Sequence, residues 1–461
     1  MTKKINFFNT LRNAKEEFVP INANKVSMYV CGPTVYDSPH IGNARPLVVF
    51  DVLYRLLREI YGESNIVYVR NITDIDDKII ESSRVKKINI EDLTKEITSS
   101  FHKDCEYLNC LKPSFEPKAT DHIKEMINMI SVLIENNNAY ENDKHVYFSV
   151  SSFKNYGNLS NKNLEQLVAG SRVEVSKSKK NPLDFVLWKP SSNGEPSWES
   201  PWGNGRPGWH LECSAMSEKY LGKNFDIHAG GLDLIFPHHE NEIAQSCCAN
   251  KTDSFAKYWM HNGFVTLNKE KMSKSTGNIV TINKIKENTN GQVIRLSLLS
   301  AHYKQPLDWN MKLVEESKKI LNKWYTMYDE ELEDEVLESL ITQKEKEEVL
   351  SPLMEDLNTP DYISKLHALF EKATTGTQTA KIQFMYGCKA IGLFSEDKTT
   401  WEDFKKSKVV IDENYINKKI IERKNARNNN NFKLADDIRH ELEKNGVIIE
   451  DTENNTTWKY K

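Results

Sequence analysis

The sequence predicts an α/β protein with a parallel sheet, followed by an α-helical region and a small α+β module at the C-terminal end. Three observations predict this class: a strand-loop-helix-strand unit near the N-terminus, a second strand-helix alternation after about residue 200, and a shift to long Leu/Lys/Glu-rich helices beyond Trp309. At 461 residues, the chain is long enough for about three domains.

The first unit begins with a short apolar strand at residues 26–31. A Gly32-Pro33 break follows, and apolar residues then recur at helical spacing over residues 47–61, before a second strand at residues 66–69. Strands joined in this way run parallel, and ligands bind at the carboxyl ends of such strands. We therefore expect the chemistry to lie in the loop at residues 32–45.

The alternation resumes after a mixed, Pro/Ser/Asn-rich stretch from about residue 101 to 200, which we interpret as an insertion. Residues 225–228 predict a strand, and residues 237–249 predict a helix whose first turn holds its proline, where a missing N–H costs nothing. A third strand at residues 258–265 is expected to lead into a basic loop at residues 271–275.

The remaining segments predict mostly helices. An acidic run at residues 329–338 is typical of a solvated helix face or a linker. From about Ile411, a basic helix pairs with a helix that ends at Asn445-Gly446, and a short strand follows at residues 447–450. This last segment is expected to form a separate small module.

Composition excludes several classes of protein. With 66 acidic and 62 basic residues, the net charge of -4 neither indicates a nucleic-acid partner nor excludes one bound by a local basic face. The sequence holds no apolar run of the ~18 residues that a membrane span needs, and no apolar segment typical of a signal peptide follows Met1. We therefore expect a cytoplasmic protein without a membrane partner.

Seven cysteines are too sparse for a disulfide framework, so each thiol is a buried packing residue, a metal ligand or a nucleophile.

The loop after the first strand contains Pro39-His40-Ile41-Gly42-Asn43. Backbone N–H groups at the following helix end can bind phosphate, His40 can donate to it, and Gly42 lets a nucleotide approach closely. Taken alone, the segment is weak evidence, because a histidine beside a glycine is usually part of a surface turn.

A second element is the basic loop Lys271-Met272-Ser273-Lys274-Ser275. It places two ammonium groups three residues apart, and such charges can stabilise the negative charge that develops on a triphosphate during its cleavage. A third element, Gly230-Gly231-Leu232-Asp233, follows a predicted strand, where Asp233 can accept hydrogen bonds from ribose hydroxyls.

Soft ligands for a metal are scattered along the chain. Cys31 ends the first strand, Cys213 lies in a predicted helix, and His238 and Glu242 are four residues apart, so they share one helix face. Two thiolates, an imidazole and a carboxylate form a tetrahedral zinc set. His239 is a rival ligand, and spacing alone does not choose between the two histidines.

The two loops together resemble the paired HIGH and KMSKS motifs of class I aminoacyl-tRNA synthetases, in the expected order. The resemblance implies a Rossmann-like catalytic domain in which His40, Asn43, Lys271 and Lys274 are catalytic, and in which these residues together with Gly42, Gly230 and Asp233 bind ATP and its Mg²⁺. The second histidine of HIGH is replaced by Asn43, which can donate a hydrogen bond but cannot carry a proton.

Four longer blocks are similar to those of the cysteinyl-tRNA synthetase family, of bacterial type, over essentially the whole chain: residues 28–36, 71–78, 208–216 and 236–242. The resemblance implies one zinc ion per chain, held by Cys31, Cys213, His238 and Glu242, and so favours His238 over His239. It also implies substrate-pocket roles for Gly32, Thr73, Trp209 and His228, although Trp209 could be ordinary core and Thr73 a strand-end cap.

Acidic residues in the second of these blocks have two interpretations. Asp74, Asp76 and Asp77 could bind a cation or an amino group, but an acidic loop that caps a helix is the more common structure.

The C-terminal module carries residues that, by the same resemblance, read an anticodon: Arg427, Phe432, Asp436 and Asp451. Arginine can bind guanine through two hydrogen bonds, carboxylates can accept from base amino groups, and an aromatic ring can stack on an unpaired base. Without the resemblance, a basic helix with one aromatic residue would be interpreted as a solvated face.

The domain organisation expected from these patterns and the resemblance has six parts. They are a first catalytic half at 1–110, a connective insertion at 111–200, a second catalytic half at 201–260, a KMSKS and stem-contact region at 261–310, a helical bundle at 311–405 and an anticodon-binding module at 406–461.

The resemblance implies a monomeric ligase that uses ATP to activate L-cysteine and then transfers it to the 3′ end of tRNA(Cys). Zinc would select the substrate because a soft thiolate bonds it far better than a hydroxyl does. Two alternatives remain: a ligase that joins cysteine to an amino-sugar, which should lack the anticodon module, and a catalytically silent tRNA-binding paralogue, for which Asn43 is the only indication.

Overall fold

The computed structural model describes residues 4–162, 178–272, 277–407, 411–451 and 456–460. Its centre is a four-stranded parallel sheet with the strand order β10-β9-β3-β4. The strands are β3 (Val26–Val30), β4 (Ile66–Arg70), β9 (Phe225–Gly231) and β10 (Ala256–Asn262). The α/β class and the parallel sheet predicted from the sequence are therefore confirmed.

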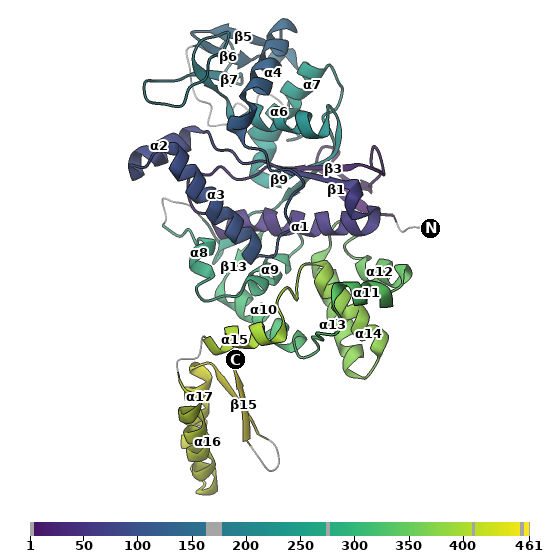
Figure 1. Cartoon of the computed structure of the whole chain (residues 1–461), viewed down its shortest axis with the longest axis vertical. Coiled ribbons are helices and arrows are strands. Elements are labelled where there is room, and N and C mark those ends of the chain that lie inside the picture. The colour runs from purple at the N-terminus through teal and green to yellow at the C-terminus, as the bar shows by residue number, and fades with distance from the viewer. Residues whose placement is uncertain (1–3, 163–177, 273–276, 408–410, 452–455, 461) are drawn as a thin grey trace.

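Both faces of the central sheet are covered, because successive side chains of a strand point to opposite faces. Met28 packs with α1 (Ile41–Tyr61) in one hydrophobic core, whereas Tyr29 packs in a second core with helices α4 (Ile123–Glu135) and α6 (Trp209–Leu221). Figure 1 shows α1 crossing below the sheet and the second layer above it. Helix α1 begins earlier than the sequence predicts and contains Pro46.

The segment between β4 and β9 forms a second layer of structure. After helices α2 (Asp77–Lys86) and α3 (Ile90–Tyr107), four strands pair in the order β5-β6-β7-β8, all antiparallel. Their bounds are Ala139–Asn142, His145–Phe148, Phe185–Pro190 and Gly205–Pro207. This sheet lies at the top of Figure 1, beside α6 and α7 (Glu240–Asn250).

Two predictions around the second half of the sheet are wrong. The helix predicted from Pro237 begins as a regular α-helix only at Glu240, because Phe236 has a non-helical backbone and a separate π-type turn spans Ile235–His239. The single strand predicted at residues 258–265 is two strands in different sheets, since the chain turns at Gly263, whose N–H donates to the carbonyl oxygen of Tyr303.

Beyond β10, a three-stranded sheet, β12-β11-β13, leads to the helices. Its strands are β11 (Val265–Leu267), β12 (Glu270–Lys271) and β13 (Leu307–Trp309). The helices are α8 (Ile282–Ile285), α9 (Gly291–Leu299), α10 (Met311–Trp324), α11 (Asp334–Leu340), α12 (Gln343–Leu350), α13 (Thr359–Thr374), α14 (Gln378–Ala390) and α15 (Lys398–Ser407). The predicted helical region is confirmed.

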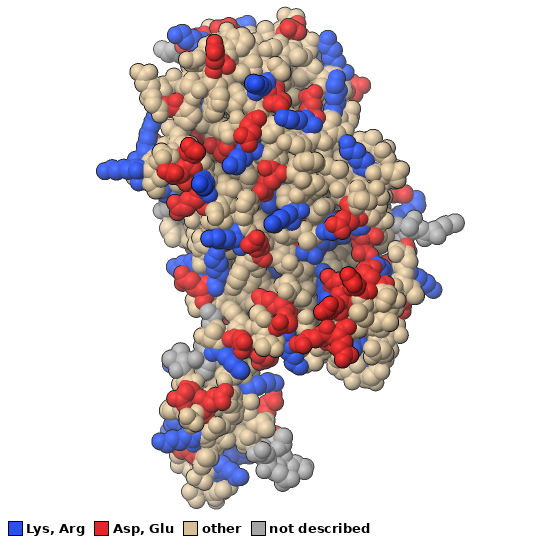
Figure 2. All heavy atoms as spheres, viewed as in Figure 1, with Lys and Arg blue, Asp and Glu red and all other residues tan. Residues whose placement is uncertain are grey.

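The acidic run at residues 329–338 ends in α11, where Glu333, Asp334, Glu335 and Glu338 are exposed. Figure 2 shows acidic side chains gathered over the part of the molecule where α11 and α12 lie in Figure 1. This arrangement confirms the interpretation of the run as a solvated helix face.

The C-terminal module consists of α16 (Glu413–Asn428), α17 (Phe432–Lys444), β14 (Val447–Asp451) and β15 (Thr456–Tyr460). The two strands form an antiparallel hairpin, and the module has a small core of its own around Ile416, Ile438 and Leu442. It projects from the rest of the chain at the bottom of Figure 1. The predicted α+β module is confirmed. The two-stranded hairpin of β1 (Asn6–Asn9) and β2 (Ala14–Glu17) completes the fold.

Candidate functional site

The carboxyl edge of the parallel sheet gathers residues that are far apart in the sequence. Cys31 and Gly32 follow β3, Thr73 follows β4, and Gly230 and Gly231 end β9. Because all four strands are parallel, their carboxyl ends lie at one edge, which is where ligands bind in sheets of this type. The sequence predicted functional residues in the loop after the first strand. The structure brings the residues that follow β4 and those that end β9 to the same edge.

A thiol pair lies at this edge. The sulfur atoms of Cys31 and Cys213 are 3.7 Å apart, with the Cys31 thiol donating to Cys213, which lies in the buried face of α6. Burial raises the pKa of Cys31 well above its usual value. Burial also opposes the ionisation of Cys213, but the hydrogen bond from Cys31 lowers the pKa of Cys213 to about 6. Of the two thiols, Cys213 is therefore the one that ionises more readily.

Glu242 lies beside the thiols and is fully buried. One carboxylate oxygen is 2.8 Å from Nε2 of His238, and the other is 2.8 Å from Nε2 of His228. Burial raises the pKa of Glu242, yet the two histidines lower it to about 2, and Glu242 in turn raises the pKa of His238 to about 10 against the effect of burial. The carboxylate is therefore ionised and can act as a ligand.

His239 also points toward the thiol pair. Its Nε2 atom is 3.2 Å from Sγ of Cys31, and its Nδ1 atom is 2.8 Å from Nε2 of His261. Burial, together with His228 and His261, holds the pKa of His239 well below its usual value, so the ring is neutral. Both histidines that the spacing left as rivals thus contact the cluster.

Two overlapping ligand sets result. In each set, four possible ligand atoms lie within 4.8 Å of one another: Cys31, Cys213, His238 and Glu242 in one, and Cys31, His228, His239 and Glu242 in the other. The donors of the first set are those that zinc prefers, and two thiolates on one tetrahedral zinc at about 2.3 Å lie roughly 3.8 Å apart. The measured sulfur separation of 3.7 Å fits that geometry.

Behind the thiols is a polar network that the sequence motifs did not single out. The side chain of Asn71 accepts a hydrogen bond from the N–H of Gly32 at 2.9 Å and donates to the hydroxyl of Thr73, which donates to Glu212 at 2.8 Å. A Cβ atom on Gly32 would lie 1.6 Å from the carbonyl oxygen of Asn71, so only glycine fits there. Both missed residues, Asn71 and Glu212, lie within the blocks 71–78 and 208–216, which was the available signal.

A pocket of about 260 Å³ opens next to the cluster, between α6, the α2 N-terminus and strand β7. Trp209 lines it and stacks on His238, with ring centroids 4.1 Å apart. His228, by contrast, is fully buried between Glu242 and the ring of Trp259, on which it stacks at 4.5 Å. Trp209 therefore lines the pocket, whereas His228 is a buried hydrogen-bond partner of Glu242.

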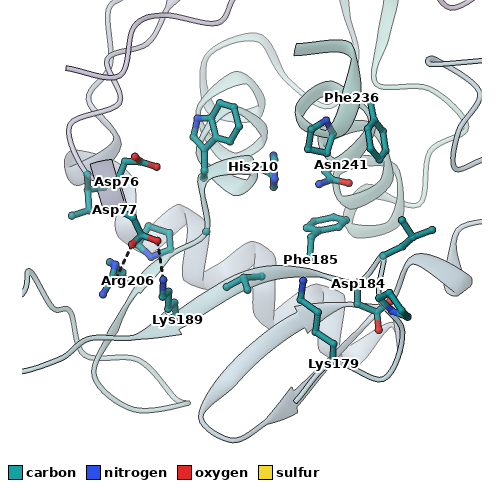
Figure 3. A pocket seen from close by; sticks show the side chains of 18 of the residues that line it. Asp76, Asp77, Lys179, Asp184, Phe185, Lys189, Arg206, His210, Phe236 and Asn241 are labelled. Atoms are coloured by element: carbon teal, nitrogen blue, oxygen red, sulfur yellow. Dashed lines mark hydrogen bonds and ion pairs between the residues drawn. The ribbon is translucent and has the colours of Figure 1, made fainter. Parts of the chain in front are cut away.

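The acidic residues beside this pocket are held by the protein itself. Figure 3 shows Asp77 paired with Lys189 and Arg206 at one end of the pocket, and both ion pairs measure 2.8 Å. Asp76 accepts from the N–H of Lys78 and caps α2, and Asp74 accepts from Thr120. The predicted capping role is confirmed for Asp76, whereas Asp77 forms ion pairs and Asp74 binds Thr120 instead.

The segment predicted to bind phosphate lies at the start of α1, with His40 as its N-cap. A Cβ atom on Gly42 would lie 2.9 Å from His40 and 3.2 Å from the side chain of Met272, so the basic loop and this segment are in contact. Asn43 is exposed at this helix end. Lys274 and the side chain of Lys271 lie outside the described residues.

The glycine loop lies at the end of β9, as predicted. Gly230 is tightly packed, since a Cβ atom there would lie 2.8 Å from Leu234 and 3.0 Å from His239. Asp233 is exposed in a short 3-10 turn, with its carboxylate near the backbone of Gly231. The loop therefore places its carboxylate at the carboxyl edge of the sheet, next to the cluster.

The C-terminal module brings arginines together around Asp451. Arg423 binds its carboxylate through two hydrogen bonds of 2.8 Å, Arg439 through one of 2.9 Å, and Arg427 is 3.2 Å away. The bond from Arg423 holds the pKa of Asp451 well below its usual value. Phe432 is 61% exposed, and Asp436 is exposed one helical turn further along α17.

Solved structures with this architecture are class I aminoacyl-tRNA synthetases. The methionyl-tRNA synthetase of Mycobacterium tuberculosis in complex with methionyl-adenylate aligns with a TM-score of 0.56 at 13% identity, over 80% of this chain and 89% of its own. The Agrobacterium radiobacter K84 agnB2 LeuRS, in a ternary complex with tRNA and LeuAMS, aligns with a TM-score of 0.57 at 10% identity, over 83% and 85%. At these identities the likeness establishes the class I synthetase fold.

The sequence narrows the class. Residues 17–319 match the family model described as tRNA synthetases class I (C) catalytic domain. The Cysteine--tRNA ligase of Pelagibacter ubique (strain HTCC1062) is 57% identical over 100% of both chains, and that of Rickettsia felis (strain ATCC VR-1525 / URRWXCal2) is 48% identical over 99% of both. The chain belongs to the cysteinyl-tRNA synthetase family. Within the described residues, no helix has the length and apolar character that crossing a bilayer requires.

Proposed function

We propose that this chain is a cysteine--tRNA ligase, which activates L-cysteine with ATP and transfers it to the 3′ end of tRNA(Cys). The observation that carries the proposal is the cluster of Cys31, Cys213, His238 and Glu242 at the carboxyl edge of the sheet, next to the pocket lined by Trp209. The full-length relatives, which are named as ligases of this kind, support it.

The first ligand set is proposed to hold one Zn²⁺ per chain. Bound there, zinc supplies a soft Lewis acid that bonds a thiolate far better than a hydroxyl, and this is the difference between cysteine and serine. His238 is favoured over His239 because its set contains both thiols. His228 and His239 are then proposed to orient Glu242 and Cys31 from behind, as hydrogen-bond partners of metal ligands do.

The other substrate groups are proposed to meet residues of the same edge. Trp209 closes the amino-acid pocket, while the network of Gly32, Asn71, Thr73 and Glu212 presents polar groups to the backbone of the amino acid. These contacts are made by buried, hydrogen-bonded side chains, so they are pre-organised before the substrate arrives.

ATP with its Mg²⁺ is proposed to bind between the start of α1 and the glycine loop. His40 and the helix N–H groups would donate to phosphate, Gly42 would allow close approach, and Asp233 would accept from the ribose. Lys271 and Lys274 would stabilise the charge that develops on the departing pyrophosphate. Asn43 would serve as a hydrogen-bonding residue there, without a proton-transfer role.

Binding of tRNA is proposed to involve the C-terminal module. Arg427 is exposed on α16, Phe432 and Asp436 are exposed on α17, and Asp451 ends β14. Guanidinium, carboxylate and aromatic groups together match the chemistry of an unpaired anticodon that contains G and C. A cytoplasmic location and a monomeric state remain predictions, and light scattering of the purified protein tests the latter.

Cysteine-dependent ATP–pyrophosphate exchange tests the proposal. Zinc-replete protein should exchange pyrophosphate with cysteine at least about 100-fold better than with serine, because zinc bonds a thiolate far better than a hydroxyl. Charging of tRNA(Cys), assayed beside an amino-sugar acceptor, separates the ligase from the amino-sugar alternative. Absence of exchange in zinc-replete protein that binds tRNA would instead establish a silent paralogue.

A further inference from the structure

The loop at residues 271–275 is joined to the rest of the molecule by two roots, and both roots contact the segment at residues 39–45. At the downstream root, the N–H of Ile41 donates to the carbonyl oxygen of Val280, and the N–H of Ile282 donates to that of Pro39, both at 3.0 Å. A backbone bridge between His40 and Thr281 lies between these bonds. The downstream root is therefore fixed by main-chain pairing.

The upstream root is held by a side chain. Strand β12, which ends at Lys271, pairs with β11, and β11 follows the turn at Gly263 and Phe264. The guanidinium of Arg45 donates to the carbonyl oxygens of both turn residues at 2.9 Å, and to that of His302 at 3.1 Å. Arg45 thus ties the first turns of α1 to the start of the strand pair that carries the loop.

The environment of Arg45 is unusual for a charged group. The side chain is completely buried, and no ion pair found among the described residues includes it. Burial lowers its pKa to about 10, which still leaves it charged at neutral pH. Its charge is therefore balanced by carbonyl dipoles that converge from two separate segments. A planar guanidinium presents its donors in a rigid fork, which suits acceptors that converge from two segments better than a compact ammonium does.

The acceptor turn is equally constrained. A Cβ atom on Gly263 would lie 2.6 Å from the carbonyl oxygen of Gln305, so this turn is packed against the chain that precedes β13. Neither the turn nor the guanidinium can shift without loss of the contact. Arg45 is thus one of the contacts that hold the α1 N-terminus beside the β11–β12 hairpin.

We propose that Arg45 is a positioning residue for adenylate formation, which holds the β11–β12 hairpin, and with it the backbone of Lys271, beside the start of α1. This inference rests on the proposed function. Arg45 touches no substrate; it acts through the placement of Lys271, whose strand it anchors. Misplacement of a reacting group by about 1 Å lowers the rate on the order of 100-fold. The relative position of the α1 N-terminus and Lys271 should therefore affect the rate of adenylate formation.

The variant Arg45→Lys keeps the charge and the aliphatic stem but cannot span three carbonyls. We expect the rate of adenylate formation to fall by about 10- to 100-fold. The KM for cysteine, the zinc content and the rate of transfer from preformed adenylate to tRNA should all stay within about twofold, because none of these depends on the loop lysines. The control is Arg295→Lys, since Arg295 is equally buried and also donates to carbonyl oxygens. These are the carbonyl oxygens of Leu108 and Ile391, and its ion pair with Asp51 lies further along α1 than Arg45. The control variant should lower stability without this selective loss.

A double-mutant cycle separates positioning from a general packing defect. In the Lys271→Ala background, Arg45→Lys should lower the rate of adenylate formation by less than about threefold further. The reason is that the ammonium group that Arg45 positions is then absent. A multiplicative effect in the double variant would overturn the inference. Gly263→Ala disturbs the acceptor turn without changing Arg45, and it should lower the rate of adenylate formation with the same selectivity. This variant replaces Arg45→Lys in the test if Arg45→Lys does not fold. Wild-type protein that fails to exchange pyrophosphate would refute the proposed function, whereas an active wild type with an equally active Arg45→Lys would refute only this inference.

Discussion

The side-chain oxygen of Asn43 accepts a hydrogen bond from the backbone N–H of His40 at 3.1 Å, across the first turn of α1. Asn43 thus satisfies a backbone donor at the helix end, in the manner of the third helical residue of a capping box. The residue that replaces the second histidine of the HIGH motif therefore has a structural contact that needs no ionisable ring.

Replacement of Asn43 separates this capping role from phosphate binding. Asn43→Ala removes the acceptor and should lower the free energy of unfolding by about 1 kcal/mol. Asn43→Asp keeps the acceptor, so its stability should match that of wild type, but its negative charge should raise the KM for ATP severalfold. Thermal unfolding and pyrophosphate exchange measure the two effects. Equal KM values for the Asp variant and wild type would show that Asn43 does not face the triphosphate.

The thiol pair makes a prediction about metal content. Cys213→Ser should abolish stoichiometric zinc in the purified protein, because a hydroxyl is a poor replacement for a thiolate ligand. His238→Ala should do the same, whereas His239→Ala should reduce zinc affinity by about 10- to 100-fold, as loss of a supporting hydrogen bond does. Elemental analysis after dialysis against a chelator gives the occupancy. Cys247→Ser, at a buried thiol outside both ligand sets, is the control. If His239→Ala abolished zinc binding and His238→Ala only weakened it, the metal would be held by the second ligand set.

A buried ion pair joins α1 to α9 and predicts an acid-sensitive stability. Asp51 accepts hydrogen bonds from Arg55 at 2.8 Å, from the N–H of Leu111 at 2.7 Å and from Arg295, which is fully buried. Burial raises the pKa of Asp51, but the two arginines hold it below its usual value. Because the folded-state pKa is the lower one, the contribution is complete above about pH 4 and is lost as the pH falls further.

Asp51→Asn leaves the charge of Arg295 buried without its partner, and should lower the free energy of unfolding by about 3–5 kcal/mol at pH 7. The difference from wild type should shrink below about pH 4, where the wild-type carboxylate also becomes protonated. Urea unfolding at both pH values measures it. Asp403→Asn, at an exposed pair with Lys406 at 3.9 Å, should change stability by less than about 0.5 kcal/mol. A loss under 1 kcal/mol for Asp51→Asn would contradict the prediction.

The C-terminal module predicts a loss confined to tRNA. Phe432→Ala should raise the KM for tRNA by about 10- to 100-fold, because stacking of one base on an aromatic ring strengthens binding by about that factor. The tRNA-independent exchange reaction should not change. Ile421→Ala removes a similarly exposed apolar side chain from α16 and should leave tRNA charging as it is. Equal KM values for the two variants would place the anticodon elsewhere.

Much of this molecule follows from local sequence patterns. Apolar spacing predicted the strands and the helix of the first unit, and the residue types of Cys31, Cys213, His238 and Glu242 predicted a soft metal cluster. The boundaries at Pro237 and at Gly263 were missed. Proline suits a first helical turn, yet here a non-helical Phe236 precedes it, and an apolar run gives no sign that a strand leaves one sheet for another.

Only the tertiary structure decided which groups meet. Cys31 and Cys213 are 182 residues apart in the sequence and 3.7 Å apart in space, because the strand order places β9 beside β3 and α6 over them. The same packing brings both His238 and His239 to the cluster, surrounds Asp451 with three arginines and directs Arg45 to three carbonyls. The sequence by itself determined most of the elements and the types of ligand atom, since backbone propensity and side-chain type are local properties. Contacts between distant segments depend on how the layers stack, and no short pattern encodes that.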